Sequence, residues 1–206
     1  MNFLFDQYEC AYFAHRFPTV TKEQLLESTI KSKDFAAKGN YEEYQRRNPG
    51  VSRNKFFDDT FIGKQGEFAS AYFVDKYSEY GFVPPDCKQY PIHLKNYDPD
   101  HKYLEFNVHV KSRRNNNGFP PSWLFQRSNP SGGGGNDSLY SRPNSVRDII
   151  FLMEIAENDT PYLVGWCTWR YAHSKLKNPI KKSLIGIKDA LYEEDLDTTL
   201  SIDKTL

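Results

Sequence analysis

Residues 103–112 alternate between apolar and polar side chains, and the polar ones are of types that do chemistry. A period of two predicts a β-strand with its even-numbered side chains, from Leu104 to Val110, on one face. The opposite face carries Glu105, Asn107, His109 and Lys111. Such a face is ordinarily the solvated side of a sheet. A chemical role therefore needs further residues that converge on it.

Asp86 is predicted to lie beside this polar face. It begins a second extended run, residues 86–94, and the segment between the two runs is rich in the turn residues Asn, Asp and Pro. If the turn centres on Asp98-Pro99, Asp86 lies opposite Lys111. If the centre moves by one residue, the pairing shifts by two residues, and Asp86 still projects on the same face of the sheet. Asp86 then projects on the side of His109 and Lys111, within about 5–8 Å. A slip of one residue would place it on the other face.

Glu67 lies on a helix predicted over residues 63–80. Apolar residues recur there at helical spacing, at Ala69, Phe73, Tyr77 and Tyr80, and Gly81 is suited to end the helix. Glu67 has apolar neighbours on its flank of this helix, where a carboxylate has little structural use. It is therefore a candidate anionic ligand.

Asp86, Glu67, a second strand ligand and Lys111 around one point would form a site for a hard divalent cation. Oxygen donors bind Mg2+, and the bound metal engages phosphate oxygens. A neighbouring lysine steadies the attacking water or the developing negative charge. This set of residues points to hydrolysis of a phosphodiester.

The ordered set Gly63-Lys-Gln-Gly-Glu67, Pro85-Asp86 and His109-Val-Lys111 resembles the PD-(D/E)xK nuclease superfamily over residues 58–169. The resemblance implies an α+β (α/β/α-like) fold with a restriction-endonuclease-like core, in which helices flank a central mixed β-sheet. It also implies metal-dependent endonucleolytic cleavage of DNA. In that pattern Asp86 is the metal-binding aspartate, Lys111 the catalytic lysine and Glu67 the helical acidic residue. Gln126, on a helix predicted after the motif strand, would be a further site residue, or else an ordinary surface glutamine.

His109 stands where the superfamily has its second acidic ligand. The implied cofactor is Mg2+ or Mn2+, and imidazole suits Mn2+ or Zn2+ better than Mg2+. His109 is therefore either a working ligand or the mark of a catalytically weakened nuclease fold that binds DNA or protein. A third interpretation is a structural protein whose polar strand face is simply solvated.

Arg113, Arg114, Asn115 and Asn116 follow the motif strand directly. Guanidinium and amide groups at such a position are suited to a phosphate backbone, although short basic runs at strand ends are commonly just solvated. The resemblance implies double-stranded DNA as the partner and is compatible with a homodimer.

Composition narrows the class of protein. The 206 residues contain 27 Lys plus Arg and 27 Asp plus Glu, and this zero net charge excludes histone-like nucleic-acid binders. No apolar run is long enough for a membrane span, and the N-terminus lacks the pattern of a signal peptide. Three widely separated cysteines fit neither a disulfide framework nor a zinc knuckle. We expect a cytoplasmic protein that does not enter membranes.

The chain is predicted to form a single domain, residues 1–206. A helical segment (1–57) precedes the nuclease-like core (58–170), and a helical tail (171–206) packs on that core. Apolar density at residues 148–155 and 162–169 predicts central, buried strands. The glycine-rich stretch within residues 127–147 predicts a flexible loop. In the tail, lysines up to Lys182 are separated from acidic residues between 192 and 197.

Overall fold

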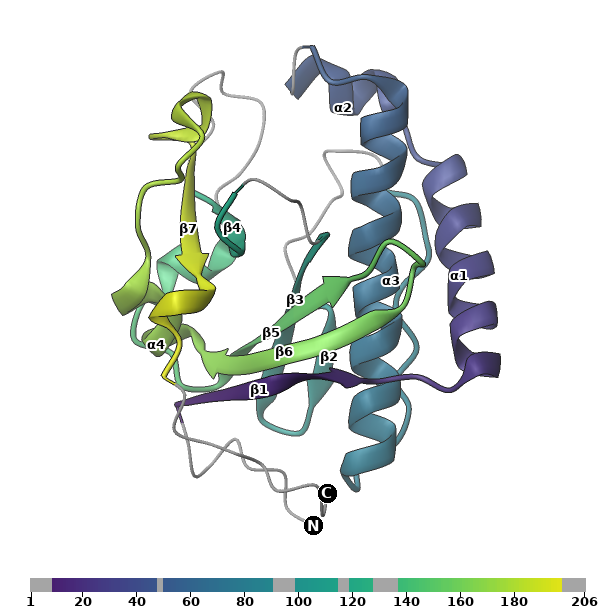
Figure 1. Cartoon of the computed structure of the whole chain (residues 1–206), viewed down its shortest axis with the longest axis horizontal. Helices are drawn as coiled ribbons and strands as arrows, with labels where there is room; N and C mark the ends of the chain where they lie inside the picture. The colour runs from purple at the N-terminus through teal and green to yellow at the C-terminus, as the bar shows by residue number, and fades with distance from the viewer. Residues whose placement is uncertain (1–8, 48–49, 91–98, 115–118, 128–136, 198–206) are drawn as a thin grey trace.

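The computed structural model describes residues 9–47, 50–90, 99–114, 119–127 and 137–197, which form an α+β fold (Figure 1). Among these residues no helix is both long and apolar enough to cross a membrane. The elements, in chain order, are β1 (Cys10–Pro18), α1 (Lys22–Ala37), α2 (Tyr41–Arg47), α3 (Arg53–Tyr77), β2 (His101–Tyr103), β3 (Phe106–Arg114), β4 (Ser122–Gln126), η3 (Ser138–Ser141), β5 (Asp148–Ile155), β6 (Pro161–Thr168), α4 (Trp169–Lys175), η4 (Lys182–Leu184), β7 (Lys188–Tyr192) and η5 (Glu193–Asp195).

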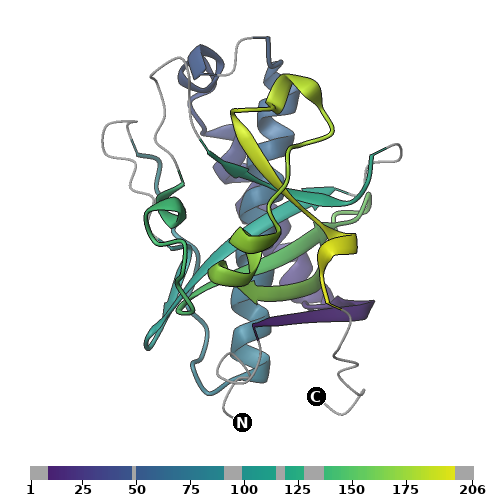
Figure 2. The same cartoon turned by 90° about the vertical axis from the view of Figure 1, so that its left-hand side faces the viewer.

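A five-stranded mixed sheet lies at the centre, with strand order β1-β6-β5-β3-β2. β3 and β5 pair in parallel, and the other neighbouring pairs are antiparallel. β4 and β7 form a separate antiparallel pair. Figure 2 shows this pair and α4 on one side of the large sheet and α3 on the other.

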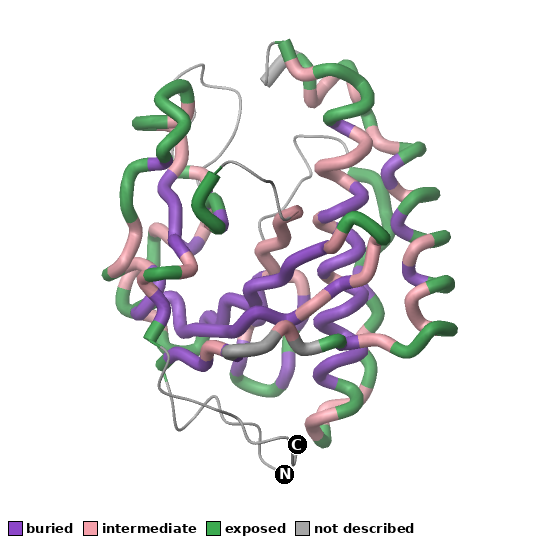
Figure 3. Tube along the Cα trace, viewed as in Figure 1, coloured by how far each residue is buried: buried purple, intermediate pink, exposed green. Residues whose placement is uncertain are grey.

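Each face of the large sheet has its own core. On one face Phe73 of α3 belongs to a cluster with Val108. On the other face Trp123 of β4 and Trp169 of α4 share a cluster with Ile150. The buried residues accordingly follow the sheet and the middle of α3 (Figure 3). A sheet covered on both faces explains why β5 is apolar almost throughout.

Several expectations from the sequence are confirmed. β5 and β6 occupy the two predicted central strands, and every residue of β5 is buried. The helix predicted from Gly63 is the C-terminal part of α3. This helix begins ten residues earlier, at Arg53, because Ser52 caps it: Ser52 Oγ accepts a hydrogen bond from Lys55 N at 3.2 Å.

Both ends of the chain differ from expectation. Residues 1–57 are predicted to be helical, and α1 and α2 confirm this in part. β1, however, is a strand that pairs with β6 at the sheet edge, from Cys10 opposite Cys167 to Pro18 opposite Tyr162. The tail is not purely helical either, since β7 pairs with β4. In both cases a partner strand distant in sequence decides the conformation, which local propensity does not report.

The predicted position of the hairpin turn is wrong. β2 pairs with β3 from His101 opposite Val108 to Tyr103 opposite Phe106, so the turn lies at Leu104 and Glu105. Leu104 takes a left-handed φ of 52° and is 86% exposed. The alternating pattern continues through this turn and therefore hides it. Residues 86–90 form no strand, and residues 91–98 and most of the glycine-rich stretch lie outside the described residues.

Two glycines of α3 have different surroundings. A Cβ on Gly66 would overlap Ser112 Oγ and lie 3.1 Å from Ser112 Cβ of β3. A Cβ on Gly63 would meet no atom within 4 Å. Gly66 thus allows α3 to lie against β3 at close range, immediately before Glu67.

We expect Gly66→Ala to lower the free energy of unfolding by about 1–3 kcal/mol, because α3 must move away from β3. Gly63→Ala in the same helix is the matched control. It should leave the free energy unchanged or raise it by up to about 1 kcal/mol, since Ala is the better helix former. Urea unfolding of both variants measures the difference. Equal effects at the two positions would contradict a close approach of α3 to β3 at Gly66.

Candidate functional site at the junction of α3, β2 and β3

Lys64 is the centre of a buried polar cluster on α3. Its side chain is 7% exposed, and Nζ donates to Glu67 Oε2 at 2.5 Å and to the backbone oxygen of Asp86 at 2.7 Å. The ammonium also lies 4.5 Å from the ring centroid of Phe35 on α1. A buried charge needs such partners. These oxygens therefore already hold one cation, the ammonium of Lys64.

Glu67 lies one helical turn after Lys64 and is largely buried. Burial and, second, the nearby carboxylate of Asp100 raise the pKa of Glu67 to about 8, although Lys64 opposes the shift. A carboxylate whose ionisation is disfavoured by burial and by a second carboxylate nearby marks a place where a divalent cation is favoured.

Asp100 lies near Glu67 because the start of β2 is held on α3. Asp100 Oδ2 accepts a hydrogen bond from Val110 N at 2.6 Å. One residue later, Nε2 of the buried His101 lies 3.1 Å from the backbone oxygen of Glu67 and 3.0 Å from Ser70 Oγ. A carbonyl oxygen only accepts, so Nε2 carries the hydrogen. Burial lowers the pKa of His101 despite Asp100, which favours the neutral ring that fixes β2 to α3.

Asp86 contributes its backbone, not its carboxylate, to this cluster. Its carboxylate accepts from Tyr90 Oη at 2.7 Å and from Lys88 N at 2.9 Å in an exposed turn. These hydrogen bonds, that of Tyr90 first, lower the pKa of Asp86. The predicted convergence of the Asp86 and Glu67 side chains is therefore wrong: Lys64 connects Glu67 to the backbone oxygen of Asp86 and not to its carboxylate.

His109 lies on the opposite side of the sheet, so its predicted convergence with Glu67 is wrong. It pairs in register with Ile150, which belongs to the core under β4. The ring is buried, and Nε2 lies 3.1 Å from Asp148 Oδ1, which also accepts from Asn107 Nδ2 at 3.2 Å. The polar strand face is covered by the β4–β7 pair. At His109 this face supports packing, whereas the side chains of Glu105 and Lys111 remain 52% and 24% exposed.

Lys111 shares that face and is likewise separated from Glu67. Its Nζ donates to Asp137 Oδ2 at 2.6 Å and lies 5.0 Å from the ring centroid of Phe125. Gln126, predicted to be helical, ends strand β4 instead, and its Nε2 donates to the backbone oxygen of Ile187 at 3.2 Å. Neither residue approaches the cluster around Lys64.

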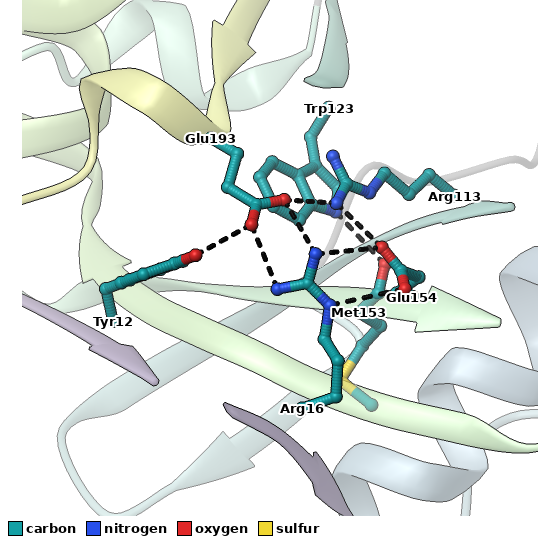
Figure 4. A network of polar contacts seen from close by, with 7 residues as sticks. All are labelled: Tyr12, Arg16, Arg113, Trp123, Met153, Glu154 and Glu193. Atoms are coloured by element: carbon teal, nitrogen blue, oxygen red, sulfur yellow. Dashed lines mark hydrogen bonds and ion pairs between the residues drawn. The ribbon is translucent and has the colours of Figure 1, made fainter. Parts of the chain in front are cut away.

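Arg113 is part of a buried network of charges, which contradicts its predicted role on a phosphate backbone (Figure 4). With a side chain that is 9% exposed, its Nη2 donates to Glu154 at 2.7 Å and to Glu193. Arg16 bridges the same two carboxylates at 2.9–3.2 Å. We call these four residues the charge network. The guanidinium of Arg113 also lies 4.2 Å from the Trp123 ring centroid.

Arg114 is also engaged within the fold. Its guanidinium forms ion pairs with Asp58 at 3.1 Å and with Asp159 at 3.0 Å. These contacts connect the end of β3 to α3 and to the β5–β6 turn. The remaining predicted nucleic-acid contacts, Asn115 and Asn116, lie outside the described residues.

Lys64, Glu67 and Asp100 together form what we call the α3 site. The sequence analysis missed Lys64 and Asp100, although both carry a signal. Pro99-Asp100 is a second Pro-Asp pair and directly precedes a strand, whereas Pro85-Asp86 does not. Lys64 stands three residues before Glu67, a spacing that places two side chains on one helix face.

The donor chemistry of the α3 site fits one type of metal. Within the described residues no group of three or more His, Cys, Asp or Glu side chains could hold a metal ion. Structural Zn2+ and Ca2+ need larger sets of ligands. Mg2+ uses one or two carboxylates and completes its shell with water and substrate phosphate. Glu67 and Asp100 fit that requirement, and both donate oxygen.

No family model matches this chain, and the comparisons with curated proteins and with solved structures gave no match either.

The raised pKa of Glu67 predicts a pH-dependent stability. Because the folded state favours the protonated carboxyl, this contribution is full below about pH 4.5 and is lost as the pH rises towards about 8. The parent protein should therefore lose stability relative to Glu67→Gln between those values, with a slope of at most about 1.4 kcal/mol per pH unit. Asp86→Asn is the control: its lowered pKa predicts no such slope in this range. Urea unfolding across the pH series measures both.

Arg113 should matter for folding. We expect Arg113→Met to lower the free energy of unfolding by about 3–5 kcal/mol, because it leaves buried carboxylates short of a partner. Arg170→Met removes an arginine from an exposed pair with Glu9 and should cost less than about 1 kcal/mol. Thermal and urea unfolding compare the two. A small loss of unfolding free energy for Arg113→Met would contradict its buried role in the charge network.

Proposed function

We propose that this protein is a metal-dependent endodeoxyribonuclease of the PD-(D/E)xK type, with its active centre at the α3 site. The observation that carries the proposal is the approach of two carboxylates, Glu67 and Asp100, beside the buried ammonium of Lys64. Glu67 and Lys64 belong to α3, and Asp100 directly precedes β2, the first strand of the β2–β3 hairpin.

The order of elements supports the proposal. A helix with a glutamate is followed by a Pro-Asp pair, an antiparallel hairpin, and then β5 parallel to β3. In this arrangement Pro99-Asp100 takes the part first assigned to Pro85-Asp86. The residues of β3 that face α3 near the site are Val110 and Ser112, which are neither acidic nor basic. Lys64 then supplies from the helix the positive charge that the superfamily places on the strand.

Each residue has a distinct role in the proposed reaction. Glu67 and Asp100 would hold Mg2+, or Mn2+ in its place, and all-oxygen donors without His109 favour Mg2+. The metal, when bound, supplies a water of lowered pKa and stabilises charge on the phosphate. The ammonium of Lys64, next to Glu67, would lie beside the developing negative charge. The three free cysteines fit the proposed cytoplasmic location.

A second candidate is a nuclease fold that binds DNA without cutting it. The specific observation in its favour is that Lys64 Nζ already occupies Glu67 Oε2, in a pair of carboxylates that lacks a third described ligand. The two candidates differ in whether phosphodiester cleavage depends on the α3 site.

Nicking of supercoiled plasmid separates them. We expect cleavage with Mg2+ in the parent, and losses of at least about 100-fold in Glu67→Gln, Asp100→Asn and Lys64→Met. Asp86→Asn removes a neighbouring exposed carboxylate, and Lys76→Met removes an exposed lysine from the same helix; both should cleave like the parent. Circular dichroism and thermal unfolding check that each variant is folded.

The outcomes decide between the candidates. Cleavage that survives in folded Glu67→Gln and Asp100→Asn would place the activity elsewhere. A parent that binds duplex DNA but never cuts it, with either metal, would select the binding protein.

A further inference from the structure

The chain that follows α3 turns back along this helix and lies on the α3 site. Val83 packs against the core and Pro85 is buried, but each residue from 86 to 90 is exposed. The backbone oxygen of Asp86 nevertheless contacts Lys64, well before α3 ends at Tyr77. We call residues 86–90 the strap, because this exposed segment crosses the helix at its buried lysine.

Within the described residues, two hydrogen bonds attach the strap to the helices beneath it. The backbone oxygen of Asp86 accepts from Lys64 Nζ at 2.7 Å, and Gln89 Nε2 donates to the backbone oxygen of Phe35 on α1 at 2.9 Å. The hydrogen bonds from Tyr90 Oη and Lys88 N to the Asp86 carboxylate lie inside the strap. The strap therefore has a shape of its own but few attachments, and a segment of this kind opens at low cost.

Both attachments of the strap lead to Lys64. The ring of Phe35, whose backbone oxygen accepts from Gln89, lies 4.5 Å from the Lys64 ammonium. The ammonium thus has Glu67 on its own helix, an aromatic ring on α1 and a carbonyl of the strap as neighbours. A phosphate can contact this buried ammonium only in place of one of them. The first two belong to helices that pack against each other, so the strap is the neighbour that can leave.

We propose that the strap is an autoinhibitory cover of the α3 site, which a substrate phosphate displaces from Lys64. This inference rests on the proposed function and concerns its regulation. With the strap in place, the carbonyl of Asp86 holds the ammonium that the proposed reaction needs beside its developing negative charge. A phosphate oxygen is charged and a carbonyl oxygen is not, so the phosphate is the stronger partner. The apparent affinity for substrate is lowered by the fraction of molecules whose strap is in place.

Gln89→Ala tests the strap, because it removes the attachment to α1 and leaves Lys64 and both carboxylates of the site intact. Gln45→Ala removes the same type of side chain from an exposed position on α2 and is the matched control. Loss of one neutral hydrogen bond raises the displaced fraction by about two- to tenfold. We expect kcat/KM for Mg2+-dependent nicking of supercoiled plasmid to rise by this factor in Gln89→Ala. The kcat should stay the same, since saturating substrate displaces the strap in both proteins.

A second readout needs no nuclease activity. Trypsin cuts after Lys88 only when the strap has left the surface, and mass spectrometry of the fragments gives the rate of this cut. Lys64→Met removes the attachment to α3 and should speed the cut by at least about tenfold, because a hydrogen bond from a charged donor is lost. Lys76→Met, on an exposed position of the same helix, should be cut after Lys88 at the rate of the parent. Thermal unfolding checks that each variant is folded.

The outcomes separate the strap from the nuclease. If the parent cuts DNA with dependence on Glu67 and Gln89→Ala cuts no faster, the strap is overturned and the nuclease stands. If neither protein cuts, the nuclease fails, and affinity for a labelled duplex of about 20 base pairs replaces kcat/KM. Tighter binding by Gln89→Ala then supports the strap, and equal binding overturns it. An unchanged cut after Lys88 in folded Lys64→Met also overturns it. If Lys64→Met does not fold, the comparison of Gln89→Ala with Gln45→Ala decides alone.

Discussion

The charge network is the constraint on which the arrangement of strands depends. Arg16 belongs to β1, Arg113 to β3, Glu154 to β5 and Glu193 to the segment after β7, so one cluster of two cations and two carboxylates joins four parts of the chain. None of these charges is tolerable in a core without the others. Tyr12 adds a hydrogen bond to Glu193 at 2.7 Å, and burial of Glu193 is more than offset by its partners, so its pKa lies below the usual value. Because these four charges must pair with one another, β1 is held at the sheet edge and the segment after β7 is held against the core.

The sequence predicted the elements whose signal is local, and missed those that depend on distant partners. β5 and β6 are dense apolar runs, and α3 carries helical periodicity, so both were accessible to pattern analysis. β1 and β7 are strands because β6 and β4 offer them an edge. The hairpin turn at Leu104 was hidden because the alternation of residues 103–112 continues through it. Once that turn is displaced, Asp86 loses its predicted register, and Glu67 is the one member of the predicted set that remains in the α3 site.

The polar face of β3 shows why a functional motif and a structural one can look alike in a sequence. His109 and Arg113 alternate with apolar residues as catalytic side chains would, yet each is buried with an acidic partner, Asp148 or Glu154. A second sheet over that face turns what would be solvated groups into fixed ion pairs and hydrogen bonds. The α3 site has the opposite character, since burial and the nearby Asp100 raise the pKa of Glu67 and the ammonium of Lys64 is shared between two oxygens. The α3 site is a candidate for chemistry because the charge on Glu67 is disfavoured there.

The length of α3 has a consequence for how a change in this helix would spread. The one helix carries Asp58, which pairs with Arg114 at the end of β3, and Glu67 of the α3 site, nine residues apart. At about 1.5 Å per residue these positions are separated by about 14 Å along the axis. A continuous helix is stiff over this length, so a displacement of α3 at the ion pair with Arg114 also displaces the carboxylate of Glu67.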